Sequence, residues 1–494
     1  MKVLALNEFP LDLLFEIAAC LDLADVLNFL SVCHSFRLLG DLRHFWKRAL
    51  EQEQKHYPLA CPLGTDLSQL DKSELESIAR HTHRVEKNWD QEEFLIGPNT
   101  KEVSYSGFGI RDTVEILAII PGTSLVLLHD GDPVFREDNE ILFVVDFEAK
   151  IPVVVLRIKR ITHHAHYDEP GRHLMAIYSE QDEASDSAIF IVSVTYGPDE
   201  TTQIQQIFQQ PLDNPCNSIF IHKIVVGYRI PTHFESENHN AGIYSINYGT
   251  KSSVKFCFTP NDDIKFAGFE FFVILGSSLA FAAVGRQGNH YTYGVYWCPI
   301  ILLDPDDAQN PGHRIDLEDV DVDLVFQTVL DPTPPDHLTG ARCMFHGMGH
   351  TLLSPLGLHA LVEGQSSSSS SSVQDVYFVN IYFWPFRDSD PPFTFAQNAL
   401  ATAYLDGHIQ FYAAAPSGMY MVVAMVQESR MYPPDGLGLF LLRYILDPPE
   451  IRVRRLLAPS HFFQDKYESI GIDERYGVIY LSHTDGKIFY IPYA

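Results

Sequence analysis

Short apolar stretches of strand length follow one another from about Glu93 to the C-terminus, and this pattern constrains the fold more than any other feature of the sequence. The stretches come in pairs joined by tight turns, as in Ile116–Ile120 and Leu125–Leu128 on either side of Pro121-Gly122. Almost nothing between them has the periodicity of a long helix. Regularly spaced antiparallel strands over about 400 residues form either stacked sandwiches or a β-propeller, whose blades repeat every 40 to 50 residues or so.

We favour a propeller of about seven blades, with six or eight as alternatives, because the hairpin pattern continues without a domain linker. The one low-complexity stretch is 364–374, where serine fills positions 366–372, and we expect a solvated loop there. A segment near Lys101–Gly107 is expected to close the ring by pairing with the last strands. The other strands are predicted at Ile141–Phe147 with Val153–Ile158, Leu174–Tyr178 with Ala188–Val194, Ile219–Tyr228 with Gly242–Tyr248, Phe269–Leu275 with Leu279–Val284, Gly294–Leu303, Ala341–Phe345 with Leu352–Ser354, Val376–Trp384, Ile409–Ala414 with Met419–Val426, Gly438–Tyr444 with Ile451–Leu457, and Gly477–Ser482 with Gly486–Pro492.

The composition is typical of a folded globular protein, with 46% hydrophobic and 20% charged residues. A formal charge of −29 disfavours nucleic acid and anionic membranes as partners, because both are bound through clustered Lys and Arg. No cationic leader opens the sequence, and apolar runs such as Phe271–Val284 are interrupted and too short to span a bilayer. Seven scattered cysteines without a CxxC pair indicate reduced thiols. We therefore expect a cytoplasmic or nuclear protein.

The first fifty residues have a helical period instead. A helix is predicted to begin at Pro10, since proline at a first helical position lacks only an N–H that needs no partner there. Asp22 is placed to cap a second helix. The helical pattern continues to Gln54, and a further amphipathic helix is predicted over Lys72–Trp89. A module of about 40 residues seldom buries enough apolar surface to be stable alone, so part of this surface is expected to contact a partner.

A set of apolar and acidic positions between Phe9 and Trp46 has a characteristic spacing. These positions are Phe9-Pro10, Leu13, Leu14, Ile17, Leu21, Asp22, Asp25-Val26-Leu27, Val32-Cys33 and Phe45-Trp46. Their spacing, which aligns without a gap, resembles the F-box, the adaptor-binding module of SCF-type cullin-RING ubiquitin ligases. The sequence departs from the family pattern at Leu23, where Pro is usual, and at Phe36, where Trp is usual.

The resemblance implies that an apolar face of this module docks on a Skp-type adaptor and, through it, on a cullin-RING ligase, by a helix-in-groove contact. The alternative interpretation is a plain helical cap on a larger domain. The residues that the resemblance assigns to adaptor contact are Phe9, Pro10, Leu13, Leu14, Ile17, Leu21, Leu27 and Val32.

No motif in the sequence supports a catalytic residue, a metal site or a cofactor, since a nucleophile elbow, a phosphate loop and a dinucleotide fingerprint are all missing. His346 and His350 have the i, i+4 spacing of a helical metal pair, but the glycines beside them oppose a helix. A second set has enough ligand types for zinc but is interpreted as a solvated link between strands. That set is His163, His164, His166, Asp168 and His173.

Most of the 33 Phe and 23 Tyr residues are expected to pack between blades. Aromatic residues expected on loops are candidates for a recognition face, because interface hot spots favour aromatic side chains. These are Tyr167, His233, Phe234, Tyr291 and Tyr432. Two arginine-rich stretches are candidates for binding phosphate, against the simpler interpretation of solvated surface charge. They are Arg157, Lys159 and Arg160, and Arg452, Arg454 and Arg455.

These patterns together predict a multidomain α + all-β protein, with an F-box at 1–50, a helical linker at 51–92 and a β-propeller-like substrate-binding domain at 93–494. Its predicted function is that of a non-catalytic substrate receptor, which raises the effective concentration of a target lysine near the conjugating enzyme. The alternatives are an adaptor-bound scaffold without ligase activity and a propeller enzyme with a helical cap. The target protein is not identified by the sequence.

Overall fold

A computed structural model describes residues 9–54, 57–91, 96, 99–104, 114–130, 140–147, 151–158, 160–179, 187–196, 202–212, 215–216, 218–229, 241–258, 265–275, 278–287, 290–299, 314–316, 323–330, 338–347, 357–366, 374–382, 402–406, 408–417, 419–426, 437–446, 449–457 and 467–493. Over residues 254–410 the description covers the backbone alone.

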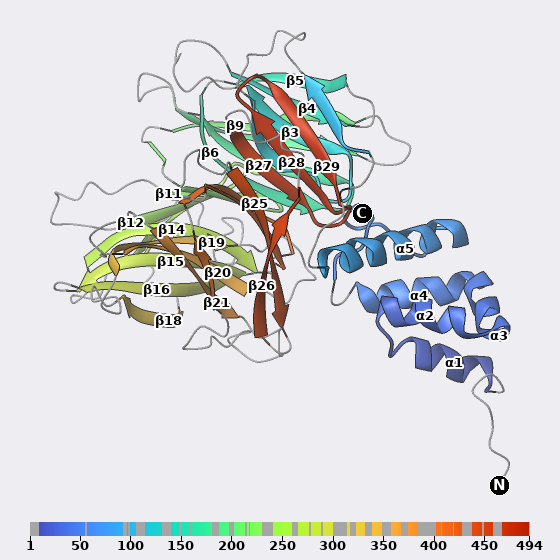
Figure 1. The fold of residues 1–494 in the computed structure, drawn as a ribbon. Helices are drawn as coiled ribbons and strands as arrows, with labels where there is room; N and C mark the ends of the chain where they lie inside the picture. The colour runs from blue at the N-terminus through green and yellow to red at the C-terminus, as the bar shows by residue number, and fades with distance from the viewer. Residues whose placement is uncertain are drawn as a thin grey trace.

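Short helices form the N-terminal module (Figure 1). Asp22 caps the second helix as predicted, its carboxylate accepting the Asp25 N–H at 2.7 Å. Pro10 precedes the first helix rather than opening it, and its carbonyl accepts the Leu13 and Leu14 N–H groups. The bounds are α1 (Leu11–Ala18), α2 (Leu23–Val32), α3 (His34–Arg37), a 3₁₀ helix (Leu38–Asp41) and α4 (Arg43–Glu53).

The helices of the module pack around a hydrophobic core that is rich in aromatic rings. Trp46 is buried, and its indole N–H donates to the Gly40 carbonyl at 2.7 Å. Phe45 meets the Trp46 ring edge to face, with 5.8 Å between centroids. Phe36 stacks on Phe29 at 4.2 Å. The phenylalanine that replaces the usual tryptophan at position 36 is therefore accommodated by ring stacking.

The helix predicted over Lys72–Trp89 is present with those bounds as α5 (Lys72–Trp89). It begins with a capping box, in which Asp71 accepts the Glu74 N–H and the Glu74 carboxylate accepts the Asp71 N–H. One side of α5 is buried, and its fully buried residues are Leu75, Ala79, Thr82, Val85 and Trp89. None of the described helices combines the length and the apolar character needed to cross a lipid bilayer.

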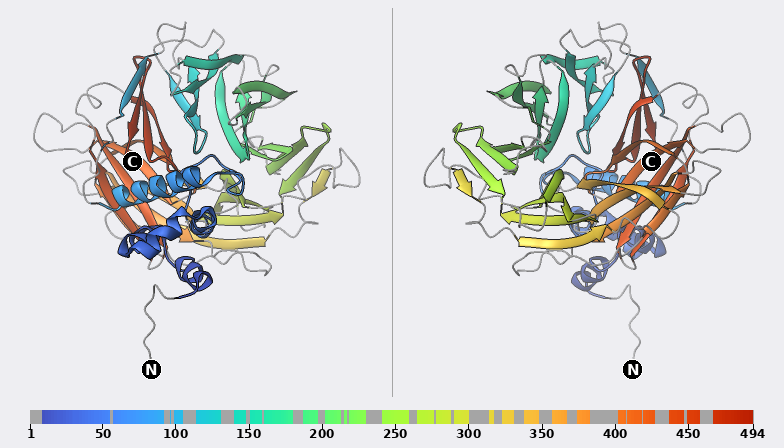
Figure 2. Two further views of the ribbon diagram at one scale, coloured as in Figure 1. Left: turned by 90° about the vertical axis from the view of Figure 1, so that its right-hand side faces the viewer. Right: turned by 90° about the vertical axis from the view of Figure 1, so that its left-hand side faces the viewer.

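The described strands form seven sheets, which are arranged as blades in a ring (Figure 2). The first strands of neighbouring sheets contact one another at several places around the ring, and the strands within a sheet follow chain order. The predicted β-propeller with seven blades is therefore confirmed. The first three blades are β2 (Glu115–Ile119), β3 (Leu125–Asp130), β4 (Glu140–Asp146) and β5 (Ile151–Ile158); β6 (Ile161–Glu169), β7 (Arg172–Ser179), β8 (Ala188–Thr195) and β9 (Gln203–Pro211); and β10 (Ser218–His222), β11 (Val225–Arg229), β12 (Ala241–Asn247) and β13 (Ser253–Phe258), with β17 (Arg314–Asp316) parallel to β13.

The next three blades are antiparallel sheets of four strands each, and β17, which lies between β16 and β18 in the chain, pairs with the preceding blade. They consist of β14 (Lys265–Leu275), β15 (Ser278–Gln287), β16 (His290–Pro299) and β18 (Asp323–Leu330); β19 (Leu338–Gly347), β20 (Gly357–Ser366), β21 (Gln374–Tyr382) and β22 (Thr402–Asp406); and β23 (His408–Ala414), β24 (Tyr420–Val426), β25 (Leu437–Leu446) and β26 (Pro449–Leu456). Strands β20 and β21 extend into both ends of the serine-rich segment, and 367–373 lie outside the described residues.

The last blade closes the ring with strands from both ends of the β region. It joins β27 (Tyr467–Asp473), β28 (Val478–His483) and β29 (Lys487–Pro492) to β1 (Lys101–Ser104), which pairs antiparallel with β29. The predicted closure by the segment near Lys101 is therefore confirmed. Closure of this kind protects the strand edges that an open sheet would expose.

Two of the predicted strand pairs differ from the structure. The stretch 219–228 is not one strand but a hairpin, β10 and β11, which turns at Lys223 with a φ of +46°, and its second half, β11, pairs with β12 as predicted. Strand β19 pairs with β20 rather than with Leu352–Ser354, a stretch that lies outside the described residues. Several strands were not predicted at all, most of them because they lack a long apolar run. These are β6, β9, β13, β17, β18, β20, β22 and β27.

The helical module lies in front of one part of the propeller ring (Figure 2). Figure 1 shows α5 between the propeller and the other helices, with α1 on the side of the module that faces away from the propeller. The position of α5 therefore determines how the two parts of the chain are joined.

Candidate functional site

Large apolar side chains are exposed on the helical module. Leu13 is 50% exposed and Val32 is 70% exposed, although both belong to helices with a well-packed inner side. The large hydrophobic residues that are strongly exposed within the described part of the chain are Leu11, Leu13, Val32, Leu38, Ile224 and Leu457. Four of these six belong to the helical module, and exposed apolar side chains concentrated in this way mark a surface for another protein.

The eight residues predicted to contact an adaptor differ in exposure. Pro10, Leu13 and Val32 are exposed to solvent, and Leu14 is 5% exposed and belongs to the core of the module. The half-buried residues of the set, which pack against that core, are Phe9, Ile17, Leu21 and Leu27. The assignment of these residues to adaptor contact stays a prediction.

Two exposed leucines were not among the predicted residues. Leu11 is 46% exposed in the first turn of α1, and Leu38 is 51% exposed at the start of the 3₁₀ helix. Leu11 directly follows Pro10, which was among the predicted contact residues, so this neighbourhood could have indicated Leu11 as a further contact residue. Leu38 gave no signal in sequence, because its exposure depends on how the 3₁₀ helix turns between α3 and α4.

The module is joined to α5 by a shared hydrophobic core. Leu75 and Ala79 of α5 are fully buried in the same cluster as Leu50 of α4. The Thr82 hydroxyl accepts the Ala60 N–H at 3.0 Å, which holds the segment after α4 against the helix. These contacts leave α5 and the module as one packed unit.

The C-terminal end of α5 belongs to the core of the propeller. Trp89 is 1% exposed and meets Tyr420 of β24 edge to face, with 4.6 Å between ring centroids. The Asn88 side chain donates to the Tyr493 carbonyl, and Asp90 pairs with the Arg443 guanidinium of β25. Because one helix contributes to two cores, its ends cannot move independently of either domain.

A second contact joins the propeller to the segment after α4. Arg475, in the β27–β28 turn, donates to the carbonyls of Leu59 and Cys61 at 3.1 Å each. Gly122, with a φ of +73°, brings the β2–β3 turn against the same segment, and a Cβ there would lie 2.2 Å from the Cys61 carbonyl oxygen. Only glycine therefore allows this approach.

Two carboxyl groups are buried close to this junction. The Glu53 carboxylate of α4 accepts the Leu23 N–H at 3.2 Å, and burial raises the pKa of Glu53 to about 7. Burial, together with the charge of Glu53, raises the pKa of Glu86 on α5 to about 8. Glu86 Oε1 has no hydrogen-bond partner among the described residues. Both groups therefore hold a proton for part of the time at neutral pH.

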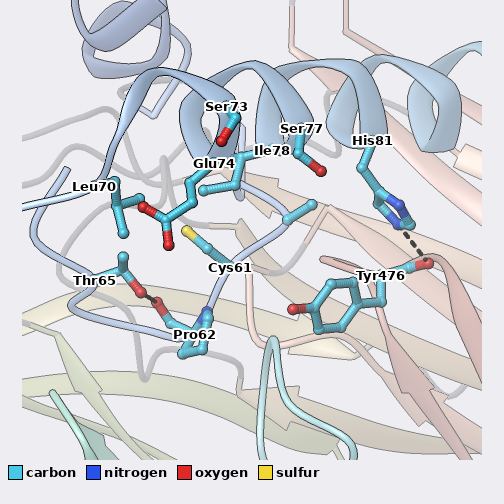
Figure 3. Close-up of a pocket in the computed structure, with 11 residues that line it drawn as sticks. Cys61, Pro62, Thr65, Leu70, Ser73, Glu74, Ser77, Ile78, His81 and Tyr476 are labelled. Atoms are coloured by element: carbon cyan, nitrogen blue, oxygen red, sulfur yellow. Dashed lines mark hydrogen bonds between the residues drawn. The ribbon is translucent and has the colours of Figure 1, made fainter. Parts of the chain in front are cut away.

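A groove of about 510 Å³ lies between α5, the segment before it and the β27–β28 turn (Figure 3). The His81 ring contacts the Tyr476 carbonyl at 3.3 Å across one side of this groove. Burial raises the pKa of the Cys61 thiol and lowers the pKa of His81. The thiol is therefore protonated at neutral pH and is a weak nucleophile, so the groove suits non-covalent contact rather than covalent chemistry.

The histidines proposed as candidate metal ligands lie in strands, not in a solvated link. Strand β6 contains His163, His164 and His166, and β7 contains His173. His173 and Asp168 form a buried pair, with 2.7 Å between Nδ1 and Oδ1. Across the described residues, no three His, Cys, Asp or Glu side chains are grouped so that they could hold a metal ion.

The other candidate residues are dispersed. His346 lies in strand β19 and is paired with His359, so it is not part of a helical pair, and His350 lies outside the described residues. Tyr167 is buried in β6 rather than exposed on a loop, and Tyr291 lies in β16. The candidates that lie outside the described residues are His233, Phe234, Tyr432 and Lys159.

The two arginine clusters are not gathered at one site. Arg452 pairs with Glu450 at 3.1 Å and lies 3.7 Å from Asp90, so it contributes to the contact between α5 and the propeller. Arg157 belongs to β5 of a different blade, and Arg160 directly precedes β6. Their role in binding phosphate stays a prediction.

Comparison with known proteins gives one match by sequence family. Residues 6–48 match the F-box domain. No curated protein sequence matches the chain. Solved structures with similar folds include the β-propeller domain of Cps50 (Swd1) from Myceliophteria thermophila, with 10% identity and a TM-score of 0.43 over 80% of this chain and 98% of that chain. A second is hydrazine synthase from Kuenenia stuttgartiensis, with 11% identity and a TM-score of 0.39 over 75% of this chain and 92% of that chain. A third is the WD40 domain of SCAP from fission yeast, with 8% identity and a TM-score of 0.37 over 78% of this chain and 82% of that chain.

The propeller assignment rests on the chain's own topology, in which seven sheets form a ring that β1 and β29 close. The F-box match covers the helices α1 to α3 and the first part of α4, and it includes the exposed residues Leu13 and Val32. The chain is therefore an F-box protein with a C-terminal β-propeller domain.

Proposed function

We propose that this chain is the substrate-recognition subunit of an SCF-type E3 ubiquitin ligase. The F-box domain binds a Skp-type adaptor and, through it, a cullin-RING ligase, while the propeller binds a target protein. The observation that supports this proposal best is the set of exposed apolar side chains of the F-box domain, among them Leu13 and Val32. The F-box domain is joined to the propeller through α5 and the segment after α4. The propeller therefore does not bury these exposed side chains.

The docking surface that we propose starts from the predicted residues and adds two. Pro10, Leu13 and Val32 present exposed apolar groups, and Leu11 and Leu38 extend them. Leu14 supports the surface from within the core. The half-buried residues lie in α1, in α2 or directly beside them, and they become contacts when a partner helix packs between the exposed ones. They are Phe9, Ile17, Leu21 and Leu27.

The proposed receptor works by proximity. A target held by the propeller is kept at a fixed distance from the ligase, because α5 is packed into both domains. Holding a lysine near the conjugating enzyme raises its effective concentration, and the receptor makes and breaks no bonds itself. This proposal divides the chain into an F-box at 1–50, a linker at 51–92 and a target-binding domain at 93–494, and it locates the complex in the cytoplasm or nucleus.

The test is binding of a recombinant Skp-type adaptor to the full chain carrying Leu13→Glu and Val32→Glu. Two carboxylates on the docking surface are expected to weaken binding by at least about 100-fold, since a few central apolar contacts carry most of the energy of an interface. The matched control is Ile224→Glu with Leu457→Glu, because these propeller residues are 47% and 48% exposed. Undiminished binding of the F-box variant would refute the docking surface.

A second measurement separates the receptor from an adaptor-bound scaffold. A receptor is expected to co-purify with the cullin and to support ubiquitin transfer to a bound protein in a reconstituted ligase. A scaffold binds the adaptor but associates with no cullin. Substitution of Leu14 is unsuitable for either assay, because Leu14 is buried and its loss would destabilise the F-box domain.

A further inference from the structure

A groove between α2 and α5 is basic, although the chain as a whole is strongly acidic. Its volume is about 370 Å³, and it is lined by Leu27, Ser77, Arg80, His83 and Arg84. None of the described residues that line it is acidic, whereas the chain contains 64 acidic and 35 basic residues. The positive charge of this groove therefore contrasts with the rest of the molecule.

The cations of α5 are only partly neutralised. Arg80 pairs with Glu76 at 2.8 Å, but the same carboxylate also pairs with Lys72 at 2.9 Å. Arg84 contacts the His81 ring at 3.3 Å, and within the described part of the chain no carboxylate lies within 4.0 Å of Arg84 or of Lys87. A groove with unneutralised positive charge is complementary to carboxylates.

The positive charge of α5 also affects the pKa of the histidine in the groove. Burial lowers the pKa of His83, and the charge of Lys87, one turn further along α5, lowers it again, while the Asp22 carboxylate at the start of α2 acts in the opposite direction. Leu27 contributes an apolar surface on the α2 side of the groove. The groove can therefore accept a segment that combines carboxylates with an apolar side chain.

We propose that this groove binds an acidic segment of the same adaptor that docks on the apolar surface of the F-box domain, an inference that rests on the proposed function. Leu27 connects the two regions, because it lines the groove and is among the residues predicted for adaptor contact. The apolar side chain of the segment covers Leu27, and its carboxylates face Arg80 and Arg84.

The groove also gives an acidic partner a preferred direction of approach. A chain with a formal charge of −29 repels such a partner over most of its surface. The α5 cations provide a local attraction, which orients the partner so that its apolar face meets the F-box. Charges at the rim of an interface act mainly on the association rate and are screened by salt.

The test is the association rate of a recombinant Skp-type adaptor with the full chain carrying Arg84→Glu and Lys87→Glu. At 50 mM NaCl we expect a decrease of about tenfold, which shrinks to less than about twofold at 500 mM. The matched control is Arg157→Glu with Arg160→Glu, which adds the same charge at exposed positions of the propeller. A neutral variant, Arg84→Gln with Lys87→Gln, avoids acidic residues near the C-terminus of α5 and is expected to give an intermediate rate.

The outcomes distinguish the two proposals. A slower rate in the α5 variants but not in the propeller control supports the basic groove. Equal rates in the α5 variants and the control, with binding still abolished by Leu13→Glu and Val32→Glu, overturn the groove and leave the receptor proposal in place. Full binding by the Leu13 and Val32 variant overturns the receptor proposal and the groove with it.

Discussion

Glu86→Gln is expected to stabilise the chain at alkaline pH and to flatten the pH dependence of its stability. Burial raises the pKa of Glu86 to about 8, the negative charge of Glu53 adds to this increase, and the Arg443 guanidinium opposes it. Asp90 and Asp22 raise the pKa slightly further. The folded chain therefore holds a proton that the unfolded chain, with an ordinary value of 4.5, has already released. This contribution to stability is complete below pH 4.5 and is lost as the pH rises through about 8.

The size of the effect follows from the two pKa values. A pKa of about 8 against 4.5 corresponds to about 5 kcal/mol of unfolding free energy, at about 1.4 kcal/mol per pKa unit. Glu86 is half-buried, so water screens part of this energy, and Glu53 titrates in the same range and shares the protons. When the pH is raised from 5.5 to 8.5, we therefore expect the unfolding free energy of Glu86→Gln to increase by about 2 kcal/mol relative to that of the natural chain.

Urea unfolding followed by tryptophan fluorescence measures this difference, because Trp89 lies on α5 near Glu86 and Trp46 lies in the F-box core. The control is Glu51→Gln, since Glu51 is on the same helix as Glu53 but is exposed and pairs with Lys47 at 3.2 Å. The unfolding free energy of that variant is expected to lie within about 0.5 kcal/mol of that of the natural chain at both pH values. Parallel pH profiles for the natural chain and Glu86→Gln would show that Glu86 is not held protonated in the folded state, and the reasoning would be refuted.

Two further predictions concern the joint between the domains. Trp89→Ala is expected to lose about 3 to 5 kcal/mol of unfolding free energy because it leaves a cavity beside Tyr420, and Trp89→Phe, which keeps the edge-to-face contact, is expected to lose less than half of that in the same urea titration. Gly122→Ala is expected to expose the segment around Cys61 to limited proteolysis, because the new Cβ would lie 2.2 Å from the Cys61 carbonyl oxygen. Gly171→Ala is its control, since Gly171 has a similar φ of +70° but its nearest neighbour would be 3.2 Å away. Equal cleavage of both glycine variants would mean that backbone strain alone, and not the contact between the domains, explains the effect.

Much of this fold was predictable because local patterns agree with tertiary packing. Helix α5 has the bounds predicted for it, since an acidic cap at Asp71 and an apolar stripe both indicate the same helix. The closing strand near Lys101 was predicted as an extended segment that pairs with the last strands, and β1 pairs with β29. Strand β9 was not predicted, because it is rich in glutamine and has one fully buried side chain, Phe208, so an outer strand of this kind lacks an apolar run. Strand β6 was mistaken for a polar link because its histidines are placed by neighbouring strands and not by a hydrophobic pattern.

The candidate site shows a different limit of sequence reasoning. Adjacent leucines of α1 have opposite roles, since Leu13 is 50% exposed and Leu14 is 5% exposed. Their apolar character is the same, and only the packing of α1 against the other helices decides which one faces solvent. The basic groove was also not predicted, because Leu27 and Arg84 are brought together by the packing of α2 on α5 and not by their spacing in the sequence.

The joint between the domains connects these features. The F-box domain turns its exposed leucines outward because α5 and the segment after α4 occupy its other side, through Leu75, Ala79 and the contacts of Arg475. The same helix ends in the propeller at Trp89, so a force on one domain is transmitted to the other through packed side chains. A receptor that acts by proximity needs this stiffness, because a flexible joint would spread the target over many positions and lower the effective concentration of its lysine at the conjugating enzyme. The buried carboxyl groups of Glu53 and Glu86 lie close to this joint, so their ionisation acts on the part of the structure that the proposed mechanism depends on most.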